Sequence, residues 1–245
     1  MMTTLQHSTT PVAQEHALWA FLQFMVLGAL DGVTELGPTG WLAGLAYGVA
    51  TWALLSGAMR RSGTVTLGPA DRVTLLRGLL VGGVTALVVT GTGPTAVLVA
   101  LAGIALALDF VDGQVARRTG TASALGARFD MEVDAFLILV LSVHVAFVVG
   151  PWALLIGVMR YAFVAASWAL PWLSGPLSPS VARKAVAAAQ GILLVVAASG
   201  VVPHAELLVG LALIALAASF GRDVLGLWTS RVASLSAPTE GCSYV

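Results

Sequence analysis

The chain alternates between long apolar runs and short polar connections. Runs of about 20 apolar residues, the length that a helix needs to cross a bilayer, recur along most of the chain. The first run is interrupted by Asp31 and Glu35, so it is only about fourteen residues long and could instead lie along the membrane interface. The pattern predicts eight membrane-spanning helices, near residues 17–33, 38–58, 73–91, 94–116, 126–149, 151–173, 183–200 and 203–226.

The composition supports this assignment. Apolar residues make up 58% of the chain and charged residues 10%, and the mean hydropathy is +0.93, well outside the range of soluble domains. We therefore expect an all-α, polytopic transmembrane helix bundle. Residues 1–16 contain no Lys or Arg, so they lack the basic start of a signal peptide and are predicted to form a polar, disordered tail. The net charge of zero hides an asymmetry along the chain and is not informative about a nucleic-acid partner, and we expect none.

All basic residues except Arg160, which falls inside the predicted span 151–173, lie in or beside alternate connections between the predicted helices or in the C-terminal tail. The connections near 31–37, 91–94, 149–151 and 200–203 contain no Lys or Arg. The positive-inside rule then places the basic connections and both termini in the cytoplasm, in a multi-pass protein of the plasma or inner membrane. The basic residues at this face are Arg60, Arg61, Arg72, Arg77, Arg117, Arg118, Arg128, Arg183, Lys184, Arg222 and Arg231.

Acidic residues concentrate on the same predicted face. Five of the 12 Asp and Glu residues fall between positions 109 and 134. Asp109 and Asp112 are three apart and Asp130 and Asp134 four apart, so each pair shares one face of a helix. Four neighbouring carboxylates repel one another unless cations lie among them, and hard oxygen ligands favour Mg²⁺ or Mn²⁺, with two ions plausible for four carboxylates.

A solvated loop is the alternative for this segment, with its aspartates paired to Arg117, Arg118 and Arg128. That alternative accounts neither for the helical spacing nor for the small residues interspersed with the acids, which would allow a ligand close to the backbone. Those small residues are Gly113, Ala116, Gly120, Ala122, Ser123, Ala124, Gly126 and Ala127.

The segment resembles the signature of the CDP-alcohol phosphotransferase family. The matching pattern is Asp109-x-x-Asp112-Gly113-x-x-Ala116-Arg117, then eight residues, then Gly126-x-x-x-Asp130-x-x-x-Asp134. The preceding "DRVTLLRG", with Thr74 and Arg77, is similar to the family's second cytoplasmic motif. The resemblance implies a six-helix family core over 61–230, two additional N-terminal transmembrane helices over 17–60, and a C-terminal tail over 231–245.

The resemblance also implies an activity. Members transfer a substituted phosphate from a CDP-linked donor, in bacteria mostly CDP-diacylglycerol, to an alcohol, and they release CMP. By similarity the four aspartates would bind two divalent ions, Mg²⁺ or Mn²⁺, and Asp134 would also accept the proton of the acceptor hydroxyl. A homodimer is the family's usual state. Residues implied in binding the CDP donor are Thr74, Arg77, Gly113, Ala116, Arg117, Ser123 and Gly126, although Arg77 could instead be an ordinary cytoplasmic anchor.

Arg160 is predicted to lie about 14 Å into its span, which is costly and indicates a functional or structural role inside the bundle. It could bind the phosphate of an acceptor together with Arg183, Lys184 or Arg222, or it could pair with one of the aspartates. Glu132 is predicted to point away from the Asp130 and Asp134 face. The identity of the acceptor alcohol is not legible from the sequence.

Two other classes of function compete with a membrane enzyme of phospholipid synthesis. A cation transporter would use the carboxylates as a pathway, but transport sites tend to lie near the membrane midplane. A noncatalytic membrane scaffold would not be expected to keep every acidic position of the signature.

Overall fold

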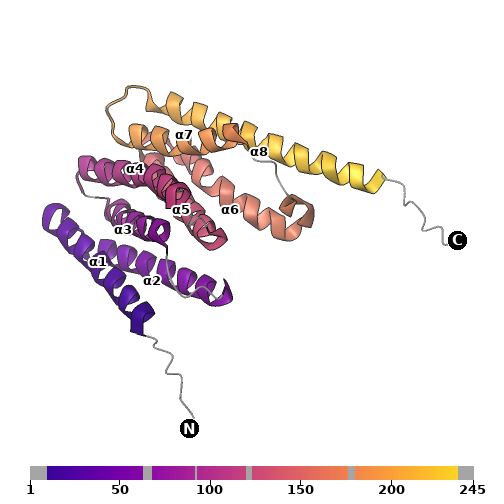
Figure 1. Cartoon of the computed structure of the whole chain (residues 1–245). Coiled ribbons are helices and arrows are strands. Elements are labelled where there is room, and N and C mark those ends of the chain that lie inside the picture. Colours follow the sequence, from indigo (N-terminus) through magenta and orange to yellow (C-terminus); the bar gives the residue numbers. More distant parts are fainter. Residues whose placement is uncertain (1–9, 63–67, 92, 120–122, 176–179, 237–245) are drawn as a thin grey trace, which may run out of the picture.

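The computed structural model describes residues 10–62, 68–91, 93–119, 123–175 and 180–236. Within these ranges the side chains of residues 10–16, 62, 112, 115–119 and 233–236 fall outside the description. The described part contains α-helices and two short 3₁₀ helices and no strand, which confirms the all-α bundle (Figure 1). The α-helices are α1 (Thr10–Thr34), α2 (Gly37–Ser62), α3 (Pro69–Thr90), α4 (Thr95–Thr119), α5 (Ala124–Val149), α6 (Leu154–Ala169), α7 (Val181–Ala198) and α8 (Ala205–Ser236).

Seven of these helices are long and apolar enough to cross a membrane. The exception is α4, whose apolar stretch over the described side chains is Thr95–Val111. The helix nevertheless continues to Thr119, because the acidic signature extends it as a polar helical end. The predicted span over 94–116 is therefore one helix with an apolar part and a polar part.

Two predicted boundaries differ from the structure. The expected polar tail over 1–16 is helical from Thr10 onward, because "TPVAQEHA" continues without a break into the first apolar run. At the other end, α8 continues to Ser236, into the predicted C-terminal tail.

The predicted span over 151–173 is divided into the 3₁₀ helix Pro151–Ala153, then α6, then the 3₁₀ helix Pro171–Ser174. Proline at the start of each 3₁₀ helix explains this division, because proline cannot continue a preceding α-helix.

Helix α3 is the centre of the bundle. In an apolar 18-residue stretch of α3, 61% of the residues are buried, against at most 39% in the corresponding stretches of the other six spans. It packs against α1, α2, α4 and α5. Gly82 permits the approach of α1 and α2, because a Cβ there would lie 2.6 Å from the amide nitrogen of Gln23 and 3.0 Å from the ring of Tyr47. The first helix of the predicted family core, α3, is thus its most buried helix.

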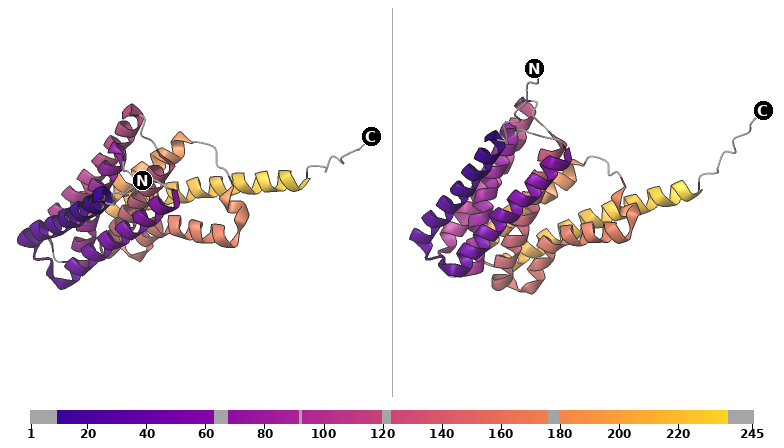
Figure 2. Two further views of the ribbon diagram at one scale, coloured as in Figure 1. Left: turned by 60° about the horizontal axis from the view of Figure 1, so that its bottom comes forward. Right: turned by 90° about the horizontal axis from the view of Figure 1, so that it is seen from below.

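The last helices leave this bundle at an angle. Helices α1 to α5 run side by side, whereas the C-terminal half of α8 projects away from them, accompanied by the end of α6 (Figures 1 and 2). Trp172 and Trp228 stack edge to face there with ring centroids 5.4 Å apart, and Arg231 lies over both rings. Such a cluster of indole rings and a cation suits the headgroup layer of a membrane.

Candidate functional site

The candidate site is formed by the C-terminal part of α4 and the N-terminal parts of α5 and α3. The C-terminal turns of α4 carry Asp109 and the first turns of α5 carry Asp130 and Asp134. The start of α5 is fixed by Ser123, whose hydroxyl accepts a hydrogen bond from the backbone N–H of Gly126 at 2.8 Å. Ser123, predicted to contact the CDP donor, is therefore the N-cap of the helix that carries two of the aspartates.

The predicted aspartates converge. One carboxylate oxygen from each of Asp109, Asp130 and Asp134 lies within 4.8 Å of the other two. Each side chain is about one-third exposed, at 38%, 34% and 35%. Asp112, the fourth predicted ligand, lies on α4, and its side chain falls outside the described residues. The structure thus brings together three of the four predicted carboxylates from two helices.

The donor set fits a hard divalent cation. Oxygen ligands of Mg²⁺ lie at about 2.1 Å from the ion, so two of them are at most about 4.2 Å apart. The three oxygens, all within 4.8 Å of one another, need only a small side-chain movement to meet this geometry. All three ligands are carboxylates, which Mg²⁺ and Mn²⁺ prefer over soft metals.

Arg77 lies inside this cluster. Its side chain is fully buried, and its guanidinium contacts Asp109 at 2.5 Å, Asp134 at 3.2 Å and the side chain of Asp130. It also donates to the backbone carbonyl of Asp130 at 3.1 Å. Neither sequence interpretation, a CDP ligand or a cytoplasmic anchor, anticipated this position among the carboxylates. With the three aspartates ionised, one guanidinium leaves a formal charge of −2, which still favours a divalent ion.

Asp71 belongs to the site but was missed in the sequence. It is 7% exposed and accepts a hydrogen bond from the backbone N–H of Gly68 at 2.8 Å, which caps α3. Its other carboxylate oxygen lies where a Cβ on Gly126 would be. The signal was present in "GPAD", because an acidic residue at the third helical position after a Gly-Pro start is typical of a helix N-terminus. Gly126, one of the residues predicted to bind the CDP donor, thus also leaves room for the Asp71 carboxylate.

The remaining predicted donor contacts are only partly described. Thr74 is buried one turn before Arg77, and its hydroxyl donates to the carbonyl of Ala70 at 3.2 Å. Gly113 is half-buried on α4. The side chains of Ala116 and Arg117 fall outside the described residues.

Two of the four predicted acceptor-binding residues form ion pairs apart from the aspartate cluster. Arg160 on α6 pairs with Glu132 on α5 at 2.5 Å, rather than with one of the aspartates. Arg183 on α7 pairs with Asp223 on α8 at 3.3 Å. Lys184 and Arg222 are exposed on the same two helices. An arginine inside a span needs a carboxylate partner, and this requirement was the signal that could have linked Arg160 to Glu132.

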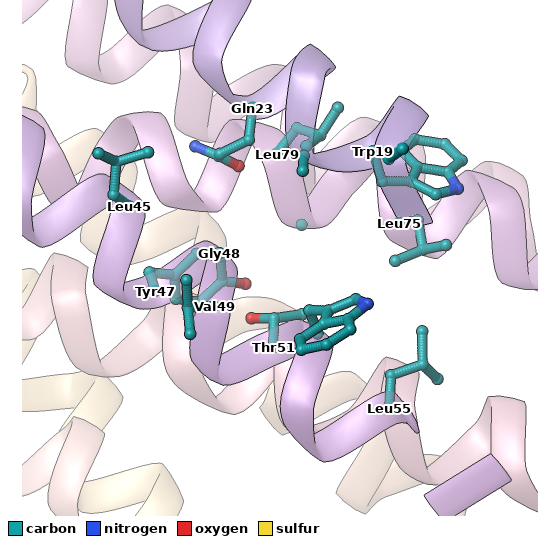
Figure 3. A pocket seen from close by; sticks show the side chains of 14 residues that line it. Trp19, Gln23, Leu45, Tyr47, Gly48, Val49, Thr51, Leu55, Leu75 and Leu79 are labelled. Atoms are coloured by element: carbon teal, nitrogen blue, oxygen red, sulfur yellow. The ribbon is translucent and has the colours of Figure 1, made fainter. Parts of the chain in front are cut away.

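An apolar pocket of about 380 Å³ lies apart from the aspartates, between α1, α2 and α3. Gln23 of α1, Tyr47 and Thr51 of α2 and Leu75 and Leu79 of α3 border it (Figure 3). No residue of the acidic signature lines it.

Comparison with protein-family models matches residues 68–221 to the CDP-alcohol phosphatidyltransferase model. This match covers well over half of the chain, from the N-cap of α3 into α8, and contains the whole candidate site. The chain therefore belongs to the CDP-alcohol phosphatidyltransferase family, which is the family predicted from the signature. Helices α1 and α2 precede the matched region. Searches of curated protein sequences and of solved structures gave no match.

Proposed function

We propose that this protein transfers a phosphatidyl group from CDP-diacylglycerol to a polar alcohol and releases CMP, as a step of phospholipid biosynthesis. Family membership supports phosphatidyl transfer from a CDP-alcohol in a multi-pass membrane protein. The observation that carries the proposal is the convergence of Asp109, Asp130 and Asp134 at the joined ends of α4 and α5. By the positive-inside rule, the basic connections favour a cytoplasmic location for this end.

The aspartates would bind the metal and position the reacting groups. Asp109, Asp112, Asp130 and Asp134 are the proposed ligands of two divalent ions, Mg²⁺ or Mn²⁺. When bound, such ions neutralise charge on the donor pyrophosphate and on the leaving nucleotide. Arg77 holds Asp109 and Asp130 from the α3 side, so the carboxylates keep their positions when the donor is absent.

The transfer requires one proton acceptor, and we assign this role to Asp134. The acceptor hydroxyl oxygen forms a bond to the phosphorus that carries diacylglycerol, and the bond from that phosphorus to the CMP oxygen breaks. The hydroxyl proton passes to the carboxylate of Asp134, and the electron pair of the broken bond leaves with CMP. A carboxylate can accept this proton because the hydroxyl becomes more acidic as its bond to phosphorus forms.

Contacts with the donor nucleotide are proposed for Thr74, Gly113, Ala116, Arg117 and Gly126. Glycine and alanine allow the nucleotide close to the backbone, and the forked guanidinium of Arg117 suits a pyrophosphate. We add Asp71 to these proposed donor contacts, because its buried carboxylate lies against Gly126 at the N-terminal end of α5.

The proposal assigns an acceptor phosphate to the basic residues Arg160, Arg183, Lys184 and Arg222, although the first and second already have carboxylate partners. A homodimer is proposed from family membership.

The test uses purified protein reconstituted in lipid nanodiscs. It is incubated with CDP-diacylglycerol, Mg²⁺ or Mn²⁺, and a panel of alcohols that includes glycerol 3-phosphate, an inositol phosphate and serine. We expect release of CMP and one new phospholipid with one of these acceptors. An absence of CMP with every acceptor would contradict the proposed function.

A further inference from the structure

A groove of about 820 Å³ separates α2 from α5. Its α2 wall includes Leu54 and Arg61, and its α5 wall includes Arg128 and Phe136. Helix α2 precedes the region matched by the family model, whereas α5 carries two of the signature aspartates. The groove therefore exists only because the family core is extended by an additional helix.

The groove lies on the face of α5 that is turned away from the aspartates. Arg128, Glu132 and Phe136 follow one another at intervals of four residues and share one face of the helix. Asp130 and Asp134 are each two residues from Glu132, about 200° around the helix. A ligand in the groove would thus be separated from the aspartates by the body of α5.

The charge of the groove is positive. Arg61 and Arg128 are exposed at its polar end, and the described residues provide no carboxylate partner for either. Glu132, the acidic residue of the lining, is paired with Arg160 at 2.5 Å. Two cations are therefore available to an anion.

The polar and apolar parts of the groove follow the order of a phospholipid. Arg61 is in the last turn of α2 and Arg128 in the second turn of α5, at the same end of the bundle. Leu54 and Phe136 lie seven and eight residues further along their helices, which is about 10–12 Å deeper. A phospholipid has the same order, because its phosphate group lies near the membrane surface and its acyl chains lie deeper.

We infer that this groove binds one anionic glycerophospholipid of the surrounding membrane, distinct from the CDP-linked donor. The phosphate lies between Arg61 and Arg128, and an acyl chain runs along Leu54 and Phe136. Each arginine near the membrane surface contributes about 1 kcal/mol of attraction to an anionic lipid. The bound lipid bridges α2 to the outer face of the helix that carries Asp130 and Asp134, which gives the additional helix α2 a role.

The inference is tested by native mass spectrometry of the full chain. The purified protein is offered phosphatidylglycerol or phosphatidylcholine with identical acyl chains. The wild type should retain phosphatidylglycerol at least about tenfold better than phosphatidylcholine. The variant R61Q/R128Q should lose this preference. The control is Arg60→Gln, which removes an exposed arginine adjacent to Arg61 that does not line the groove, and it should bind as the wild type does.

A second variant tests the apolar part. Ala50→Trp fills the groove from an exposed position of α2 and leaves both arginines in place, so it should reduce retention of phosphatidylglycerol. Unchanged retention in both R61Q/R128Q and Ala50→Trp would overturn the inference, and so would equal losses in Arg60→Gln and R61Q/R128Q. Displacement of phosphatidylglycerol by CDP-diacylglycerol would also overturn it, because the groove would then belong to the donor. None of these measurements depends on transferase activity.

Discussion

The guanidinium of Arg77 and the carboxylate of Asp109 lie 2.5 Å apart, which links the most enclosed helix of the bundle to the first aspartate of the signature. The same arginine contacts Asp134 at 3.2 Å. One buried cation therefore holds together carboxylates from two further helices. Removal of the cation or of a carboxylate should have separable effects on stability and on activity.

Substitution of Arg77 by Met should destabilise the protein. The change removes a buried charge from among three aspartates, which then repel one another. Because the aspartates are about one-third exposed, we expect a loss of about 2 kcal/mol in the free energy of unfolding, or a fall of about 5 °C in Tm. Mg²⁺ should raise the Tm of Arg77→Met more than that of the wild type, since the ion replaces the lost positive charge. Equal Mg²⁺ effects on the Tm of both proteins would contradict this account.

Asp134→Asn should abolish CMP release without unfolding the protein. The amide keeps the shape of the side chain but cannot accept the proton, so the rate should fall at least about 100-fold. Binding of the CDP-linked donor should stay measurable. Asp31→Asn is the matched control, because Asp31 lies on α1, outside the family match. CMP release by this variant should be unchanged. Near-normal turnover in Asp134→Asn would exclude a role as the proton acceptor.

Removal of divalent ions should stop the reaction. EDTA should eliminate CMP release, and either Mg²⁺ or Mn²⁺ should restore it, because the donor set consists of carboxylate oxygens. Asp109→Asn should raise the Mg²⁺ concentration needed for half-maximal activity by at least about tenfold. Full activity in EDTA would contradict the metal site.

Gly126→Ala should destabilise the protein through contact with Asp71. The added Cβ meets a carboxylate oxygen of Asp71, which is itself held by its hydrogen bond to Gly68. We expect a loss of about 1–3 kcal/mol in the free energy of unfolding, and a smaller loss in an Asp71→Ala background. Gly103→Ala in α4 is the control, since no atom lies within 4 Å of its added Cβ. The same loss with and without Asp71 would show that the contact is not responsible.

The pair of Arg160 and Glu132 should separate a structural role from acceptor binding. If Arg160 acts through its pair with Glu132, Arg160→Ala should lower kcat and leave the KM for the acceptor within about twofold. The effects of Arg160→Ala and Glu132→Ala should then be less than additive. A large rise in the acceptor KM for Arg160→Ala alone would instead place this arginine at the acceptor.

The sequence by itself determined the membrane bundle and the identity of its acidic residues. A span of apolar residues has one low-energy arrangement in lipid, because a helix satisfies its own backbone hydrogen bonds. The intervals of three and four residues place Asp109 with Asp112 and Asp130 with Asp134, since the geometry of a helix depends only on local spacing. The position of Glu132 away from the Asp130 and Asp134 face follows from the same geometry.

Only the tertiary structure decided which residues of different helices meet. Arg77 is 32 positions from Asp109 and 53 from Asp130, and Arg160 is 28 from Glu132, so no helical periodicity relates them. The packing of α3 between its neighbours places Arg77, predicted from the sequence as a donor ligand or a cytoplasmic anchor, inside the acidic cluster. The same packing brought Asp71 against Gly126. Such contacts depend on side-chain volume and helix approach across the whole bundle, and these are properties that local spacing does not contain.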